Sequence, residues 1–172
     1  MSRRSLKIGL LGLLITLLLL VEACGFRLRG STDISLTLAD TYVTGSAAQS
    51  RLAVELRRAL RQSGVTVVES RDVAEQILTL DAERKGRRAA SLNTRGNIQD
   101  YELRYEVDFS LSSRAGEVVL PRQTVTLVRS YSYDQDQVLA KDREEQSLYR
   151  TMRSELVRNI MRRLQAVARR QP

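Results

Sequence analysis

The fold class is decided by the stretch Tyr101-Glu102-Leu103-Arg104-Tyr105-Glu106-Val107-Asp108-Phe109-Ser110-Leu111, in which apolar and polar residues alternate without exception. Successive side chains of a β-strand point to opposite faces, so this alternation predicts a strand with one buried and one solvated face. A turn signal at residues 113–116 and the segment 124–133 that follows it predict the return of an antiparallel hairpin. Arg129, Tyr131 and Tyr133 on the returning strand are spaced for a common face.

Upstream of this strand, the sequence predicts one helix set among shorter strands. Leucines recur every fourth residue at 52, 56 and 60, between capping-box spacing that begins at Ser46 and a helix stop at Gly64. We therefore expect a helix over residues 47–63. Strands are expected at residues 34–38, 65–69 and 77–82. The arginines that interleave with the leucines, at positions 51, 57, 58 and 61, are expected to form a solvated basic face.

Downstream, the sequence predicts a long helix that opens with Asp142-Arg143-Glu144-Glu145, because acidic residues suit the first turn of a helix. Its apolar stripe is Leu148, Met152, Leu156, Ile160, Leu164 and Val167, and arginines gather near its end at positions 162, 163, 169 and 170. The predicted order is β-α-β-β-β-β-α. We expect an α+β two-layer sandwich, with a mixed or antiparallel sheet of four to five strands and both helices on one face.

The first residues indicate export from the cytoplasm. A basic start at Arg3, Arg4 and Lys7 precedes 14 residues without a charge, Ile8 to Val21, which is the length of a signal-peptide core and too short for a spanning helix. Cys24, the single cysteine of the chain, follows directly and resembles the acylated cysteine of a bacterial lipoprotein. We therefore expect a signal peptide over residues 1–23, a single domain over residues 24–172, and a lipid anchor on Cys24. Gly25 after the cysteine favours the outer membrane.

Composition narrows the classes of function. The 172 residues include no histidine and one cysteine, which excludes histidine-based catalysis and His/Cys zinc sites. No phosphate-binding loop or calcium loop is present, so we expect neither an enzyme nor a metal or cofactor site. The net charge of +8 predicts an anionic partner. An exported protein is unsuited to nucleic acid as its ligand, whereas lipopolysaccharide is an abundant polyanion of the Gram-negative envelope.

A basic run occupies residues 84–95. The sequence Glu83-Arg84-Lys85-Gly86-Arg87-Arg88 places four cations within five positions, and a polar connection follows through Asn97. Two interpretations are open for this segment: a flexible, solvated loop, or a binding site in which Arg84, Lys85, Arg87 and Arg88 engage lipid A phosphates. Guanidinium groups suit the second interpretation because their planar fork captures phosphate with two hydrogen bonds.

The residues that follow the signal, Cys24-Gly25-Phe26-Arg27-Leu28-Arg29-Gly30, resemble the start of the LPS-assembly lipoprotein family LptE. The similarity continues in Leu60-Arg61-Gln62-Ser63-Gly64-Val65, in the strand at Tyr101, in Val128-Arg129-Ser130-Tyr131 and in Leu139-Ala140-Lys141-Asp142. Members of that family are outer-membrane lipoproteins with an α+β fold. They sit as a plug inside the β-barrel LptD, assist its assembly, and bind lipopolysaccharide on its way to the outer leaflet.

The resemblance also implies specific residues. A basic residue in the connection before the Tyr101 strand and the lysine of the Leu-Ala-Lys-Asp motif contribute to lipopolysaccharide binding in the family, and these correspond to Arg95 and Lys141 here. The resemblance therefore implies LptD and lipopolysaccharide as partners, and a location at the outer membrane that faces the periplasm and the barrel lumen. A second hypothesis is a basic envelope lipoprotein that acts as a secretion-channel pilot or as an adaptor for anionic polysaccharide.

Overall fold

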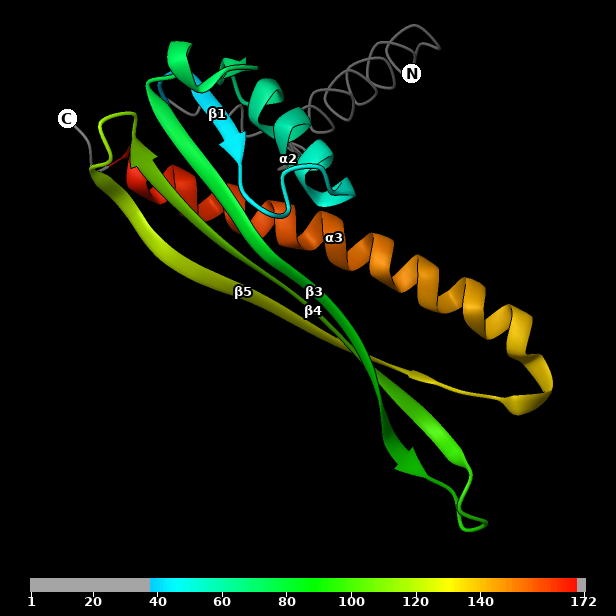
Figure 1. The fold of residues 1–172 in the computed structure, drawn as a ribbon. Helices are drawn as coiled ribbons and strands as arrows, with labels where there is room; N and C mark the ends of the chain where they lie inside the picture. The colour runs from blue at the N-terminus through cyan, green and yellow to red at the C-terminus, as the bar shows by residue number, and fades with distance from the viewer. Residues whose placement is uncertain (1–37, 170–172) are drawn as a thin grey trace, which may run out of the picture. The chain divides into compact units, whose positions relative to one another are not determined.

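The computed structural model describes residues 38–169 and has the predicted order of elements (Figure 1). The strands are β1 (Thr41–Thr44), β2 (Val67–Val68), β3 (Gln76–Leu92), β4 (Ile98–Ser113) and β5 (Val118–Ser132), and the helices are α2 (Arg51–Gln62) and α3 (Val138–Ala168). The α+β fold class, the five-stranded mixed sheet and the two-layer arrangement are confirmed.

The sheet has the strand order β2-β1-β3-β4-β5. The short strand β1 pairs in parallel with β2 and with the first residues of β3, as expected when a helix connects β1 to β2. The long strands β3, β4 and β5 are antiparallel, and Tyr101 of β4 lies opposite Tyr131 of β5. The predicted hairpin between these segments is therefore confirmed, and it is longer at both ends than the alternation indicated.

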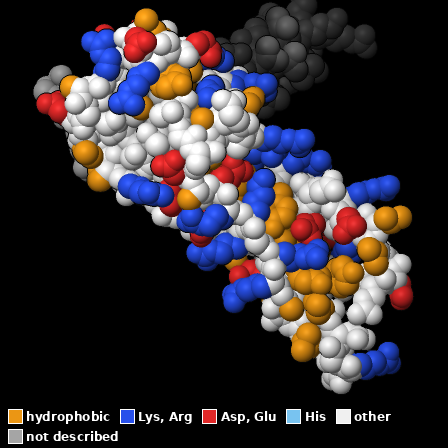
Figure 2. Space-filling view, in the orientation of Figure 1, with side chains coloured by type: hydrophobic (Ala, Val, Ile, Leu, Met, Phe, Trp, Pro, Cys, Tyr) orange, Lys and Arg blue, Asp and Glu red, His pale blue; other side chains and the backbone are white. Residues whose placement is uncertain are grey.

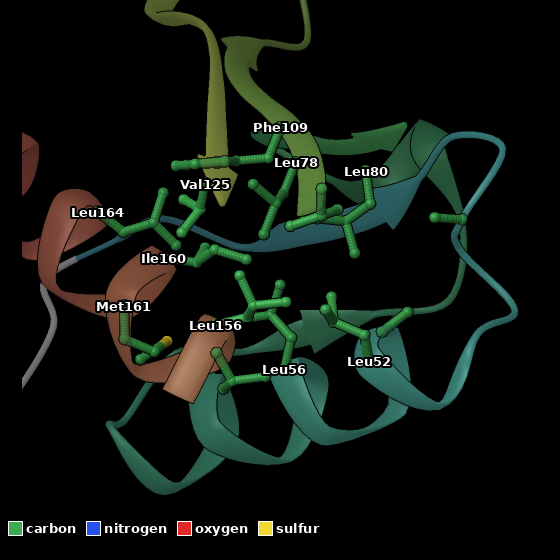
Figure 3. Close-up of a cluster of buried hydrophobic side chains, with 14 of the residues drawn as sticks. Leu52, Leu56, Leu78, Leu80, Phe109, Val125, Leu156, Ile160, Met161 and Leu164 are labelled. Atoms are coloured by element: carbon green, nitrogen blue, oxygen red, sulfur yellow. The ribbon is translucent and has the colours of Figure 1, made fainter. Parts of the chain in front are cut away.

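The hydrophobic core lies between the sheet and the two helices (Figure 3). Leucines 52 and 56 of α2 point toward the sheet, and α3 contributes Leu156, Ile160, Met161 and Leu164. The sheet supplies Leu78, Leu80, Phe109 and Val125. These side chains come from both helices and from β3, β4 and β5, which explains why the leucine stripe and the β4 alternation were reliable guides to burial.

Several predicted boundaries are wrong. The helix predicted to begin after Ser46 begins at Arg51, with Ser50 as its N-cap: the hydroxyl of Ser50 accepts the Ala53 N–H at 3.2 Å. The final helix begins at Val138, which places the acidic residues after Asp142 beyond its first turn. Of the strand predicted at residues 34–38, positions 34–37 lie outside the described residues, and the first described strand starts at Thr41.

The largest difference concerns the basic run. The strand predicted to end at Ala82 continues to Leu92, so Arg84, Lys85, Arg87 and Arg88 lie on β3 and not in a solvated loop. The connection to β4 is short, at residues 93–97, and it contains Arg95. The sequence pattern failed here because the second half of β3 is exposed on both faces and therefore lacks apolar alternation.

A β-bulge interrupts β3 where its apolar half ends. Its register against β4 shifts between Asp81 and Arg84, and Ala82 has a φ of 47°. The turn after β1 holds the bulge in place: the Ser46 N–H donates to Asp81 Oδ1 at 3.1 Å, and the Ala82 N–H donates to Ser46 Oγ at 3.2 Å. Because the bulge adds one residue, it reverses which face each later side chain of β3 occupies.

Candidate functional site

Strand alternation divides the basic run between the two faces of the sheet, and the bulge decides which residues take which face. Lys85 and Arg87 turn toward the helices, where their cationic groups lie 4.7 Å and 4.5 Å from the ring centroids of Tyr105 and Tyr101. Arg84 and Arg88 turn to the opposite face, which we call the outer face. The four residues predicted to act as one cluster are thus two pairs that face different surroundings.

The outer face carries a ladder of alternating charges. Arg84 Nε donates to Glu106, and Arg88 Nε donates to Glu102 at 2.7 Å. Glu106 also receives a hydrogen bond from Arg104 at 2.9 Å. These guanidinium groups, Arg84 first and Arg104 second, hold the pKa of the Glu106 carboxyl below its usual range. Each cation of this face that the sequence singled out therefore already has a carboxylate partner.

The ladder ends at Asp108, which is 7% exposed. Its carboxylate accepts from Thr124 Oγ1 at 2.6 Å and from Arg122 Nη2 at 2.8 Å. The hydroxyl of Thr124, followed by the guanidinium of Arg122, lowers the pKa of Asp108. The described helices lie on the other side of the sheet, so this polar ladder is uncovered by any element of residues 38–169.

On the helix side, Glu145 of α3 joins the two layers. Its Oε2 accepts from Arg87 Nη1 at 2.7 Å and from the hydroxyl of Tyr131 at 2.8 Å. The hydrogen bond to Glu145 raises the pKa of Arg87, whereas burial and then the Glu145 carboxylate raise the pKa of Tyr131 to about 12. Tyr101 of β4 stacks on Tyr131 with ring centroids 5.9 Å apart. The predicted common face of β5 meets α3 through the Tyr131 hydroxyl and through Arg129, which pairs with Glu155 at 2.7 Å.

Lys85 belongs to a second junction. The hydroxyl of Tyr105 donates to Glu83, whose Oε1 lies 3.5 Å from Lys85 Nζ. Burial raises the pKa of Tyr105, and the Glu83 carboxylate adds to that shift. Tyr149 of α3 packs edge-on against Tyr105 and donates its hydroxyl to the carbonyl of Gly86. This junction fixes β3 against α3 on the Lys85 side of the bulge.

Arg95 and Lys141, the two residues implied by the family resemblance, have different surroundings. Arg95 is exposed in the turn between β3 and β4, where the carboxamide oxygen of Asn93 accepts its backbone N–H at 3.0 Å. Within residues 38–169, its guanidinium makes no ion pair. Lys141 lies at the end of the first turn of α3, its side chain is 18% exposed, and it bonds Glu144 at 2.9 Å.

Exposed apolar side chains accompany these two cations. Leu92 at the end of β3 is 60% exposed, and Leu139 at the start of α3 is 75% exposed. Figure 2 shows hydrophobic side chains gathered toward the hairpin end of the molecule, with Lys and Arg side chains interspersed with acids along the strands. We call the turn with Arg95, the start of α3 with Lys141, and Leu92 and Leu139 the hairpin end; Figure 1 shows the turn and the start of α3 at separate points toward the same end of the fold. It combines positive charge with apolar surface, a combination that suits an anionic amphiphile.

Sequence reasoning missed the acidic partners Glu102, Glu106 and Glu145. The first two were placed correctly on the polar side of the Tyr101 strand, but nothing local showed that they would meet the basic run. Pairing β3 through Arg88 with β4 is what brings them together. Cys24 lies outside the described residues. The helices among residues 38–169 include none long and apolar enough to cross a membrane.

Comparison with known proteins gives a consistent result. A family model described as "LptE: Lipopolysaccharide-assembly" matches residues 27–164. The "LPS-assembly lipoprotein LptE" of Photorhabdus laumondii is 30% identical over 159 residues, which cover 92% of this chain and 86% of that protein. The protein of the same name from Yersinia pestis is 28% identical over 162 residues, which cover 92% of this chain and 76% of that protein.

Two solved lipoproteins share the fold. A solution NMR structure of lipoprotein B from Nitrosomonas europaea has a TM-score of 0.71 at 28% identity, and the match covers 83% of this chain and 91% of that chain. The crystal structure of rare lipoprotein B from Shewanella oneidensis has a TM-score of 0.64 at 27% identity, with coverage of 74% and 94%. Sequence and structure thus agree over most of the chain.

Proposed function

We propose that this chain, which belongs to the LptE family of lipopolysaccharide-assembly proteins, is a lipid-anchored, non-enzymatic component of lipopolysaccharide delivery to the outer leaflet of the outer membrane. The observation that carries the proposal is the family match over residues 27–164, which includes every described strand and nearly all of α3. Its role in lipopolysaccharide assembly follows from that membership. The proposal includes no catalytic step and no cofactor beyond the lipid on Cys24.

The anchor is proposed from the sequence. Residues 1–23 act as a signal peptide, Cys24 becomes the acylated first residue of the mature domain 24–172, and its acyl chains hold the domain at the outer membrane. Metabolic labelling with palmitate tests this step. The wild-type chain should incorporate label and Cys24→Ala should not. Labelled Cys24→Ala would contradict the anchor without bearing on the lipopolysaccharide site.

Lipopolysaccharide binding is proposed at the hairpin end. The guanidinium of Arg95 is exposed and can offer two hydrogen bonds to one phosphate of lipid A. Lys141 adds a second cation, and Leu92 and Leu139 offer apolar surface to the acyl chains. Arg84, Lys85, Arg87 and Arg88 are proposed as secondary contributors, because the family resemblance does not imply them and each of them already contacts a carboxylate, as Lys141 does through Glu144.

The outer face supports the proposal that the domain plugs the β-barrel LptD. Interiors of large membrane barrels are polar, and a plug needs a polar surface to meet them. The charge ladder from Glu102 to Asp108 is such a surface, with its charges held in fixed geometry by neighbouring strands. We propose that this face meets the barrel lumen, while the opposite face of the sheet packs against the helices to form the hydrophobic core.

Lipopolysaccharide retention by purified protein tests the site. We expect Arg95→Glu combined with Lys141→Glu to lose most of the lipopolysaccharide that co-purifies, because each reversal replaces a phosphate attraction with a repulsion. The matched control is Arg71→Glu combined with Arg162→Glu, which changes the net charge equally at exposed positions outside the hairpin end. Equal retention by the two double variants would refute the assignment of Arg95 and Lys141. Loss of the barrel with retained lipopolysaccharide would instead place these residues at the protein interface.

The alternative function, a secretion-channel pilot or polysaccharide adaptor, predicts a different set of partners. It explains the signal sequence and the basic charge, but it does not explain the family match. Recovery of a secretion channel in place of a lipopolysaccharide-transport barrel would favour it.

A further inference from the structure

A second basic site lies between the two helices, apart from the hairpin end. A groove of about 440 Å³ runs between α2 and α3. The side of α2 is formed by residues 51, 54, 55, 58, 59 and 62, a spacing that lies along one helix face, and the side of α3 by residues 153, 154, 157 and 158. Four of the lining residues are arginines: Arg51, Arg58, Arg153 and Arg158. Two arginines of the α2 face that is predicted to be a solvated surface, Arg51 and Arg58, thus line a groove.

The charges in the groove do not balance. Glu55 is the acidic residue of the groove lining. Its carboxylate already accepts hydrogen bonds from Arg153 Nε at 3.1 Å and from the hydroxyl of Ser154. Arg51, Arg58 and Arg158 are exposed and form no ion pair within residues 38–169. Three cations thus line one concave surface without a counter-charge among the described residues.

The other two arginines of α2, Arg57 and Arg61, make structural contacts outside the groove. The arginines of α2 without such contacts therefore lie on the groove face. Arg57 donates to the carbonyl of Val43 at 3.2 Å, and Arg61 pairs with Glu69 at 3.2 Å. Both contacts tie α2 to its flanking strands and turns. The two arginines of α2 that have no such structural contact, Arg51 and Arg58, are the two that line the groove.

The groove also has an apolar side. Val54 stands between Arg51 and Arg58 on the same helix face and is 54% exposed, although it is a valine. Ala59 and Val157 continue the apolar lining. Exposed aliphatic surface framed by guanidinium groups matches the boundary between the phosphate and the chains of a lipid. A simple inorganic anion would gain nothing from Val54.

We propose that the groove between α2 and α3 binds the phosphate headgroup of an acidic phospholipid, with Arg51, Arg58 and Arg158 around the phosphate and Val54 against the start of the acyl chains. The volume suits a headgroup and is within the range of small-molecule sites. Arg153 is held by Glu55 and adds to the positive electrostatic potential of the groove. The inference goes beyond lipopolysaccharide binding at the hairpin end, since Arg153 is 12 residues along α3 from Lys141, or about 18 Å of helix.

Native mass spectrometry of the full chain tests this inference. The protein is released from a non-ionic detergent that contains either phosphatidylglycerol or phosphatidylcholine at the same mole fraction, and the fraction that carries a bound lipid is measured. We expect selective retention of phosphatidylglycerol. We expect Arg51→Glu combined with Arg58→Glu to lower that retention by about tenfold or more, because two charge-assisted hydrogen bonds are replaced by repulsion.

The matched control is Arg71→Glu combined with Arg143→Glu, which changes the net charge equally at exposed positions that do not line the groove. It should retain phosphatidylglycerol as the wild type does, and thermal melting checks that both double variants are folded. Equal retention by the groove variant and the control would overturn the proposal. Retention of phosphatidylcholine equal to that of phosphatidylglycerol would also overturn it. Displacement of phosphatidylglycerol by equimolar inorganic phosphate would overturn the claim that the groove recognises a lipid. Stronger binding of an acidic peptide would reassign the groove to a protein partner.

Discussion

Gly45, in the turn after β1, is the residue whose replacement should most disturb the link between that turn and β3. Its φ is +105°, and a Cβ added there would lie 2.2 Å from the backbone oxygen of Leu80. That oxygen also accepts the Ala47 N–H at 3.0 Å, so the turn cannot move away without losing a hydrogen bond. Backbone strain of about 1–3 kcal/mol and a lost hydrogen bond of about 1 kcal/mol predict that Gly45→Ala costs about 2–4 kcal/mol of unfolding free energy.

Urea unfolding followed by circular dichroism measures this cost, with two glycines as controls. Gly96 has a φ of +79° but nothing within 4 Å of an added Cβ, so Gly96→Ala should cost about 1–2 kcal/mol from strain alone. Gly86 has neither constraint, and Gly86→Ala should leave stability unchanged or raise it by less than about 1 kcal/mol. If Gly45→Ala were as stable as Gly86→Ala, the close approach of the turn to Leu80 would be wrong.

Three further results are expected. Ser50→Ala removes the N-cap of α2 and should lower the unfolding free energy by about 1 kcal/mol in the same urea assay, whereas an unchanged midpoint would contradict the cap. The pKa of Asp108 is lowered in the folded chain, so the ionised carboxylate stabilises the fold above the ordinary pKa of about 4, and this stabilisation is lost as pH falls through the lower folded value. Asp108→Asn should therefore make acid unfolding less steep. An unaltered pH profile of stability would count against the pair with Arg122. Glu145→Gln keeps an acceptor for Tyr131 but removes the charge that neutralises Arg87, so lipopolysaccharide retention should rise, and unchanged retention would show that Arg87 contributes little.

The parts of the fold that were predicted correctly are the segments with one face in the core and the opposite face in solvent along their whole length. The β4 alternation and the leucine stripe of α2 both report such a boundary between core and solvent, and both segments are buried on the expected side. The second half of β3 has no such boundary, because its partners on each face are charged or aromatic side chains from distant segments. A local pattern therefore could not distinguish that strand from a solvated connection.

The candidate site was harder to predict than the fold for a related reason. Arg84 and Lys85 face opposite sides of the sheet because they are neighbours on a strand, and the bulge at Ala82 decides which side each one takes. A single residue of register reverses that assignment, and neither Ala82 nor its neighbours carry a sequence signal for a bulge. The acidic partners Glu102 and Glu145 come from separate elements, so the neutralisation of the basic run depends on tertiary structure.

The helix was predicted to start one turn too early because Ser46 has capping-box spacing. Ser46 has capping-box spacing, but its side chain binds the bulge of β3, and Ser50 caps α2 one turn later. Local spacing identifies residues able to cap a helix, whereas tertiary contacts decide which one does.

The proposed role in lipopolysaccharide delivery is tested by purifying the lipidated protein from outer membranes in a gentle detergent, with mass spectrometry of the bound proteins and an assay of bound lipopolysaccharide. We expect a stoichiometric complex with the large β-barrel LptD, together with lipopolysaccharide. Recovery of the lipoprotein with neither a barrel partner nor lipopolysaccharide would contradict it.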